Sequence, residues 1–388
     1  MAQKTPKDRQ SIGFLLFDDG RGRIANALSK AISYERDPKL FDEEYIKNRD
    51  KELKELQKTK DADKSLCIDR RNKPVVLTSY QSRIIHALSY AISREMQTSE
   101  DVKKKVEDAF NKNDGNVIKR IVNISNLTRL ICNSTRKRYK DRIINEIYNL
   151  SRVRQVQFIS YKNKTYKLTT PFITLGADLE DVTPNPEIKT DAEDISKNAE
   201  TNDNSDFIEI QFCSTFFYKL SSRYAIITPK LFEVWSKKGR GTELFDVLLS
   251  SLFSVYWTCM QAANNAETHV REDFSNRELS MEELRKAIAD ARQDAMRYEL
   301  NISSIKRKVR TDYDSNPKMK RQFWIDLQNA INGYIEYHLI TDAIIQKGAK
   351  GQDKIIFTLS ENYYLVETEN TRRPILLTKQ DDKELSAF

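Results

Sequence analysis

Residues 117–170 combine the two periodicities of apolar positions that distinguish helices from strands. Apolar residues at 127–131, directly after two capping residues, predict a short helix. A second helix is predicted over residues 136–151, and its single apolar stripe consists of Ile143, Ile147 and Leu150. The residues between the two helices have the character of a turn, so a helix-turn-helix unit is predicted here.

Strand patterns flank this helix pair. Residues 155–159 and 166–170 alternate apolar and polar side chains, and the turn at residues 161–165 contains two lysines, so a hairpin with a basic tip is predicted. Residues 117–124 predict a short strand before the helix pair, and an apolar stripe predicts a first helix over residues 77–96. Helix, strand, helix, turn, helix and hairpin in this order form the winged-helix layout.

The face of the second helix opposite its apolar stripe has the composition of a DNA recognition helix. At 100° per residue, Arg138, Arg142, Asn145 and Asn149 fall within about 60° of one another. In the major groove, arginine pairs bidentately with guanine and asparagine pairs with adenine. A plain amphipathic surface helix would also carry a polar face, so the pattern leaves both interpretations open.

A second copy of the same layout is predicted near the end of the chain. Residues 301–309 repeat the Asn-Ile-Ser start, the arginine and the apolar positions of residues 123–131. Further along, the stripe of the second helix is repeated by Leu327, Ile331 and Tyr334. The far face of that helix carries Lys318, Gln322 and Asn329. Two architectures of one kind are therefore expected in tandem.

The second copy also contains a predicted hairpin and an ambiguity. The hairpin spans residues 341–359, with a basic tip at residues 347–352. Upstream, Ser280 begins a capping box that predicts a helix over residues 281–300. This helix is an alternative first helix of the motif, so which helix of the second copy enters DNA stays open.

Other apolar patterns indicate a core. Residues 245–260 are too short and too polar for a membrane span and are predicted to form a buried helix. Residues 207–217 predict a strand. The three tryptophans, Trp235, Trp257 and Trp324, are predicted to be core residues.

The first part of the chain repeats a segment found later. Residues 23–33 resemble residues 83–93, which predicts two similar helices. They either pack together, or exchange between protomers, or are ordinary amphipathic helices of like composition. Residues 39–60 predict a solvated helix with charge pairs at i, i+4. His86 lies beside an apolar stripe and is predicted to be a core histidine.

Charge changes the picture because it is unevenly placed. The chain has a net charge of +8 and a pI near 9.0, which favours anionic partners. Residues 117–170 contain 13 Lys and Arg against 2 Asp and Glu, and residues 302–324 contain 7 against 2. Residues 178–206 contain 10 Asp and Glu against 2 Lys, are rich in Asn, Thr and Ser, and predict a flexible linker.

These patterns predict an α+β fold, mostly helical, with two tandem winged-helix domains and an N-terminal helical extension. The predicted division is an extension over residues 1–65, a first winged-helix domain over 66–177, an acidic linker over 178–206, a second winged-helix domain over 207–365 and a tail over 366–388.

Several kinds of chemistry lack their residues. Cys67, Cys132, Cys213 and Cys259 form no C-x-x-C pair, so neither a zinc site nor a disulfide framework is expected. The three histidines are far apart in sequence, which disfavours the metal site that rolling-circle nicking enzymes use with a tyrosine nucleophile. The sequence contains no phosphate-binding loop. We expect no enzymatic activity, no cofactor and no metal. No signal peptide or membrane span is expected, which together with the cysteine usage indicates a cytoplasmic protein.

With this layout, the chain resembles the plasmid replication initiators of the iteron-binding type, which have two winged-helix domains in tandem. The likeness covers residues 70–365. It rests on residues 75–78 leading into the helix at 81–91, on the basic helix and hairpin of residues 137–170, and on residues 354–359. The acidic linker and the first 65 residues depart from the family pattern, which leaves the dimer interface open.

The resemblance implies a function in a bacterial cytoplasm. Such initiators bind repeated double-stranded DNA sites at the plasmid origin, help to open an AT-rich segment and recruit the host replication helicase or initiator proteins. Many also repress their own gene as homodimers. A winged-helix transcription regulator or a phage replication organiser would have the same fold, so both remain alternatives.

The residues expected to contact DNA follow from the basic segments and from position in the family layout. In the first copy they are Arg136, Lys137, Arg138, Lys140, Arg142, Asn145, Asn149, Lys162, Lys164 and Lys167. In the second copy they are Lys306, Arg307, Lys308, Arg310, Lys318, Lys320, Arg321, Gln322, Asn329, Lys347 and Lys350.

Overall fold

A computed structural model gives the fold. It describes residues 14–15, 21–33, 65–69, 75, 77–111, 116–161, 164–175, 207–213, 216–217, 224–237, 242–274, 280–348, 353–361 and 363–365. The predicted helix at 39–60, the acidic segment at 178–206 and the tail at 366–388 lie outside these residues, as do Lys162 and Lys350. In the described part the protein is α+β and mostly helical, as predicted.

The first module is built around α4 (Ser79–Thr98), which matches the predicted first helix. A capping box starts it: the Thr78 hydroxyl accepts from the backbone N–H of Gln81 at 3.1 Å, and the Gln81 side chain accepts from Thr78 N–H at 3.0 Å. Residues 81–93 are buried without interruption, so α4 is surrounded by protein rather than lying on the surface. A further helix, α5 (Glu100–Asn111), follows it and was not predicted.

The predicted helix-turn-helix unit is confirmed. Strand β4 (Asn116–Asn123) runs into α6 (Ile124–Cys132), and the side chain of Asn123 caps this helix by accepting from the N–H of Asn126 at 2.9 Å. The turn contains Asn133, which ends α6 in the left-handed region with φ 49°. Helix α7 (Lys137–Ser151) then buries the predicted stripe.

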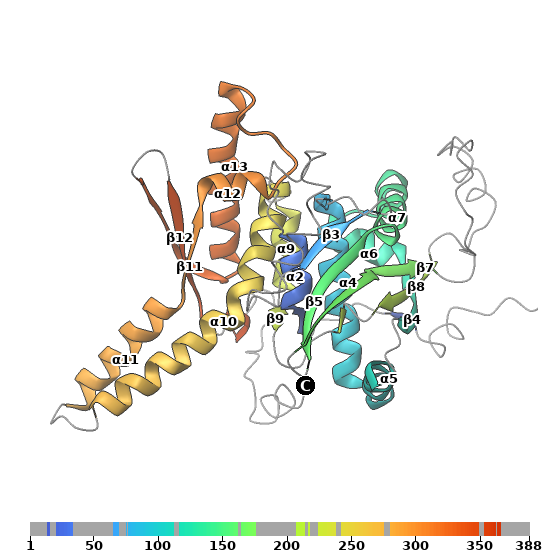
Figure 1. The fold of residues 1–388 in the computed structure, drawn as a ribbon. Helices are drawn as coiled ribbons and strands as arrows, with labels where there is room; N and C mark the ends of the chain where they lie inside the picture. Colours follow the sequence, from blue (N-terminus) through green and yellow to red (C-terminus); the bar gives the residue numbers. More distant parts are fainter. Residues whose placement is uncertain are drawn as a thin grey trace, which may run out of the picture.

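The predicted hairpin is also present, but its partner strand is not β4. Strands β5 (Arg154–Tyr161) and β6 (Lys164–Pro171) are antiparallel, and the third strand of their sheet is β3 (Ser65–Ile68), which pairs with β5. Figure 1 shows β5 and β6 extending from the α7 side of the molecule to its lower edge. The far ends of both strands therefore lie away from α7.

Strand β4 belongs to a different sheet. Its order is β1 (Phe14–Leu15), β4, β8 (Phe207–Cys213) and β7 (Ile173–Leu175). β8 is antiparallel to both β4 and β7. The strand predicted over residues 207–217 thus exists, but it completes a sheet of the first module instead of starting the second. The predicted domain boundary at residue 207 therefore needs correction.

Residues 21–33 are part of the core rather than an extension. Strand β2 (Gly22–Ala25) pairs antiparallel with β9 (Tyr224–Ile227), and α2 (Asn26–Ile32) packs against the long helix described next. β2 approaches α4 so closely that a Cβ on Gly22 would lie 2.5 Å from the Cα of Tyr90, so the site excludes every side chain larger than hydrogen. This corrects the predicted N-terminal extension.

The second module begins with helices. Short α9 (Lys230–Ser236) precedes α10 (Glu243–Phe274), whose first half is the predicted buried helix. α11 (Met281–Ala295) begins at the predicted capping box of Ser280. It ends earlier than predicted, because the chain continues as β10 (Arg297–Asn301). Figure 1 shows the second half of α10 and all of α11 leaving the body side by side.

The remaining elements complete the predicted second copy. They are α12 (Ile302–Arg307), α13 (Pro317–Glu336), β11 (Ile340–Gln346), β12 (Lys354–Leu359) and the 3-10 helix η4 (Tyr363–Leu365). The sheet order is β10-β12-β11, with both neighbours antiparallel. As β4 does, β10 ends in Asn followed by the Ile that begins the next helix, so the repeat seen in sequence is a structural repeat.

Aromatic residues join the second module to the rest of the core. The Tyr334 hydroxyl donates to the carbonyl of Phe245 at 2.6 Å, and the Tyr363 hydroxyl donates to the carbonyl of Ile226. Tyr337 is fully enclosed beside them, and its hydroxyl accepts from the N–H of Thr228 at 3.2 Å. These bonds satisfy buried hydroxyls while their rings fill the core.

The three tryptophans have different environments. Trp235 is buried, and Trp257 is half-buried and stacked on Tyr224 with ring centroids 5.8 Å apart. Trp324 on α13 is 42% exposed, so its predicted place in the core is wrong. None of the helices in the described part of the chain combines the length and apolar character that crossing a bilayer requires.

Candidate nucleic-acid interface

Helix α7 presents the predicted polar face to solvent. Its apolar stripe of Ile143, Ile147 and Leu150 is fully buried, so the rotation of the helix is fixed. Arg136, at its N-cap, and Lys137, Arg138, Arg142, Asn145 and Asn149 are exposed, and Lys140 is half-buried. The same face also carries exposed Asp141, which is not among the predicted DNA contacts because those are basic residues and asparagines. An aspartate here has the chemistry to accept from the amino group of cytosine.

Two arginines of α7 are oriented by aromatic rings. The guanidinium carbon of Arg142 lies 3.8 Å from the ring centroid of Tyr80 at the start of α4. Arg138 stacks 4.7 Å from the ring of Tyr139 and donates from Nη2 to its hydroxyl at 2.9 Å. Stacking limits the freedom of a long side chain, so less conformational entropy would be lost when the arginines bind a phosphate or a base.

The lysines of the first hairpin are less well placed. Lys164 and Lys167 lie on β6, and their side chains are not described. β6 begins at the end of the hairpin that lies away from α7 (Figure 1). Lys164 and Lys167 therefore remain predicted contacts.

Helix α13 carries the cations of the second module at its start. The side chain of Asn316 caps it by accepting from the N–H of Met319 at 3.0 Å, and Pro317 occupies the first turn. Lys318, Lys320 and Arg321 are exposed. Figure 1 shows this end of α13 projecting beyond the rest of the module. The positive end of the helix dipole and three cations are therefore presented together to solvent.

The outer face of α13 is rotated from the predicted one. Gln322 and Asn329 are half-buried rather than exposed. The Gln322 amide donates to Asp326 at 2.8 Å. The residues opposite the buried side are Arg321, Trp324, Ile325, Gln328 and Asn332. The prediction used three apolar positions, whereas the buried side also includes Phe323, Asp326 and Gly333, which shift its centre. No sequence signal marked Gln328 and Asn332.

The cations of α12 make contacts within the module. Lys306 forms an ion pair with Asp314 at 2.7 Å and lies 5.1 Å from the ring centroid of Phe323. Arg307 donates from Nη2 to the hydroxyl of Ser304 at 3.2 Å. These contacts order the connection between α12 and α13, so both residues are half-buried parts of the fold.

Lys308 joins the second module to the first, and Arg310 bonds to α10 of its own module. The ammonium of Lys308 donates to the backbone carbonyl of Ser33 at 2.6 Å. The backbone N–H of Arg310 donates to Glu243 at 2.7 Å, which leaves its side chain exposed. Of the four predicted cations in this stretch, Arg310 alone is exposed.

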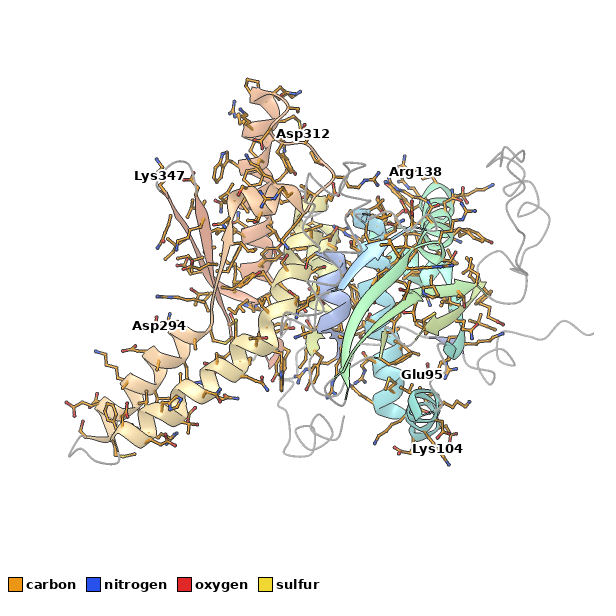
Figure 2. All side chains as sticks on the ribbon, in the orientation of Figure 1. Glu95, Lys104, Arg138, Asp294, Asp312 and Lys347 are labelled. Atoms are coloured by element: carbon orange, nitrogen blue, oxygen red, sulfur yellow. The ribbon has the colours of Figure 1, made fainter. Side chains whose placement is uncertain are left out.

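The exposed cations at the starts of α7 and α13 lie on one side of the molecule. Figure 2 shows Arg138 near the start of α7, Asp312 next to the start of α13, and Lys347 at the end of β11 all on the upper side. Glu95 and Lys104 lie on the lower side. Lys347 is exposed. A single extended polyanion on the upper side would therefore meet α7, α13 and the second hairpin.

A polar cluster, most of it buried, joins α4 of the first module to α10 of the second. We name it the module junction: Ser79, Arg83 and His86 of α4 with Asp246 and Ser250 of α10. Nε of Arg83 donates to both carboxylate oxygens of Asp246, at 2.9 and 3.0 Å, and the Ser79 hydroxyl donates to the same carboxylate. Arg83 also lies 5.0 Å from the ring centroid of Trp235. Because two charges are paired in the core, the junction tolerates little movement.

Burial shifts the pKa values of the junction. Desolvation raises the pKa of Asp246 to about 6, although Arg83 opposes this shift. Desolvation lowers the pKa of His86 to about 4, so His86 is neutral at pH 7. Nδ1 of His86 lies 2.6 Å from the carbonyl of Ser82, and Nε2 lies 3.4 Å from the Ser250 hydroxyl. The prediction of a core histidine is confirmed.

Within the described residues no group of three His, Cys, Asp or Glu side chains is close enough to hold a metal ion. Burial raises the pKa of the thiols of Cys67, Cys213 and Cys259, which keeps them protonated.

Comparison with known proteins adds a distant structural likeness. No protein-family model and no curated protein matches the chain. A solved structure described as RctB domains 2-3 aligns with 76% of this chain and 86% of its own length, at a TM-score of 0.29 and 11% sequence identity. The winged-helix-like arrangement of the two modules rests on the strand order and helix packing of this chain itself.

Proposed function

We propose that this protein binds double-stranded DNA through α7 and α13 and initiates replication at a plasmid origin in the bacterial cytoplasm. The observation that carries the proposal is that two modules of like layout present exposed, cationic helix starts on the same side (Figure 2). A polyanion that spans both modules would contact the two starts together.

Phosphate contacts would supply most of the affinity. Arg136, Lys137, Lys318 and Lys320 sit at or next to helix N-termini, where the dipole and the backbone N–H groups also favour anions. Arg138, Asn145 and Asn149 on α7 have the chemistry to read base edges. The module junction would hold the two helices at a set distance, which is what recognition of a fixed spacing between half-sites requires.

The assignment to replication initiation rests on the family resemblance of the sequence. It adds to DNA binding the opening of an AT-rich segment, recruitment of host replication proteins and repression of the protein's own gene as a dimer. We propose no enzymatic step, cofactor or metal. A transcription regulator is the second candidate, because the same surface would serve it equally well.

Binding and replication are separable in experiments. Fluorescence anisotropy with duplexes from the DNA flanking the gene is expected to show specific binding that weakens steeply as salt increases. Arg138→Ala should weaken binding to the specific duplex, whereas Lys104→Ala, which changes an exposed lysine on the lower side, should not (Figure 2). Equal effects of the two changes would contradict the proposed surface.

Origin function is tested in cells. The gene with its flanking DNA is placed on a plasmid whose own origin has been removed, and recovery of the plasmid is measured. Protection of several direct repeats in a footprint, together with plasmid maintenance, supports an initiator. Protection of a single palindrome without maintenance would support the regulator instead.

A further inference from the structure

The first half of the outer face of α13 carries two large apolar side chains that packing does not explain. Trp324 is 42% exposed and Ile325 is 45% exposed. Single exposed apolar residues are common on protein surfaces. Here two adjacent ones lie on the face that the proposed function places against DNA, between Arg321 and Gln328. This inference therefore rests on the proposed function and concerns what the second module recognises.

The helix geometry groups these residues. At 100° per residue, Arg321, Trp324, Ile325 and Gln328 fall within an arc of about 100°, opposite the buried Phe323. The ring of Trp324 packs edge-on against the ring of Phe323, with centroids 5.2 Å apart and an interplanar angle of 75°. Since Phe323 is fully buried, the indole is held in place while part of its surface stays open.

The charges around this apolar pair indicate an anionic partner. The two acids of α13 do not contribute to its outer face. Asp326 is buried and accepts from the Tyr313 hydroxyl at 2.8 Å, and Glu336 in the last turn is paired with Lys237. Lys318, Lys320 and Arg321 are all exposed at the other end of the helix. On α13 itself the apolar pair thus has exposed cations beside it, and the exposed acids Asp312 and Asp314 lie in the connection before the helix. Cations next to an apolar pair fit an anionic partner such as the major groove of DNA.

The major groove offers one apolar group to such a patch, the C5-methyl group of thymine. We infer that Trp324 and Ile325 contact thymine methyl groups and give the second module a preference for T within its part of the site. The amide of Gln328, which donates to Asn332 at 3.0 Å, lies on the same face. An amide pairs with adenine, so the face suits A·T base pairs as a whole.

Replacing thymine by uracil tests the methyl contact directly, because uracil keeps the hydrogen-bonding edge and loses only the methyl group. Duplexes selected from a random pool by the full chain are resynthesised with deoxyuridine at one thymine position at a time. We expect about a fourfold loss of affinity for each contacted methyl, as for exposing one methylene-sized group. The sensitive positions should cluster in one part of the site.

Variants connect those positions to α13. In Ile325→Ala and Trp324→Ala the difference between thymine and uracil should shrink toward zero at the sensitive positions. Met281→Ala is the matched control, since Met281 is 65% exposed at the start of α11 rather than on α13, and it should keep the full difference.

The outcomes separate this inference from the proposed function. If the chain selects no DNA sequence, the proposed function fails. If it selects a sequence whose affinity is indifferent to uracil at every position, or if Ile325→Ala and Trp324→Ala keep the full thymine preference, DNA binding stands and the inference is overturned. Loss of self-association in Trp324→Ala, measured by sedimentation with DNA affinity unchanged, would assign the patch to a second copy of the chain and also overturn it.

Discussion

The two modules share one order of elements but build their sheets differently. In the second module β10 pairs with β12. The strand before the helix pair therefore belongs to the same sheet as the hairpin that follows the helix pair. In the first module β4 pairs with β1 and β8, and the hairpin receives β3 instead. Each hairpin gains a third strand, but only the second module takes it from a continuous stretch of chain.

The recognition helices differ in the same way. α7 shows arginines, asparagines and Asp141 to solvent, whereas α13 shows Trp324 and Ile325 beside its cations. The second hairpin ends on the same side as the start of α13, whereas the first extends away from α7 (Figures 1 and 2). One layout therefore supports two reading surfaces of different chemistry.

The largest expected effect concerns the junction that holds the two modules together. Asp246→Ala removes one partner of a buried ion pair and leaves Arg83 charged in the core. We expect a loss of about 3–5 kcal/mol in the free energy of unfolding, measured by urea denaturation. Lys237→Ala breaks an exposed pair with Glu336 and should cost about 0–1 kcal/mol. Similar losses in the two variants would show that the modules are not held by this pair.

Base reading by the first module comes next. Arg142→Ala and Asn145→Ala should each cost about 1–3 kcal/mol of binding free energy and relax specificity at one base position. Anisotropy with duplexes changed at single base pairs measures this. Lys318→Ala is the comparison from the second module, where we expect a weaker and sequence-independent loss. If the α7 variants lost affinity equally for all duplexes, the helix would be a phosphate-binding surface only.

The free energy of unfolding should also depend on pH because of the module junction. The pKa of His86 is lowered from 6.5 to about 4, so between these values the unfolded chain binds the proton and the folded chain does not. The contribution of neutral His86 is complete above about pH 6.5 and is lost toward pH 4, by up to about 1.4 kcal/mol per pH unit. Denaturation of His86→Gln between pH 4 and 7 should show a shallower loss than the parent protein.

Asp246 changes the stability with pH in the opposite direction from His86. Its pKa is raised from 3.8 to about 6, so between these values the folded chain holds the proton and acidification stabilises the protein. Asp246→Asn removes that compensation and should steepen the loss of stability on acidification. Parallel pH profiles for the parent and both variants would contradict the assignment of these two groups.

Local pattern predicted most of the elements. The stripes of α7, the repeated Asn-Ile start of α6 and α12, and the Ser280 capping box are each encoded within a few residues, so sequence alone sufficed. The partner of a strand is not local in this sense: nothing near residue 207 indicates that β8 will pair with β4. The same holds for β2, whose partner β9 lies in the other half of the chain.

The candidate site shows the same limit. Periodicity predicted that α13 has a polar face, but its rotation depends on which residues the neighbours bury. Tyr313 holds Asp326 inside, which turns Gln322 to the flank. Trp324 is predicted to be buried because tryptophan usually is, yet it is 42% exposed on the outer face of α13.

The smallest expected effect concerns the connection between the two helices of each helix pair. In the first module Asn133 ends α6 with φ 49°, a conformation that asparagine tolerates and alanine does not, whereas every residue of the longer connection at 308–316 keeps a negative φ. Asn133→Ala should therefore cost about 1 kcal/mol of unfolding free energy, and Asn133→Gly should stay within a few tenths. Urea denaturation of both variants distinguishes a backbone effect from loss of the amide, because the amide is absent from both. Equal losses in the two variants would mean that the side chain, not the left-handed turn, sets the angle between α6 and α7.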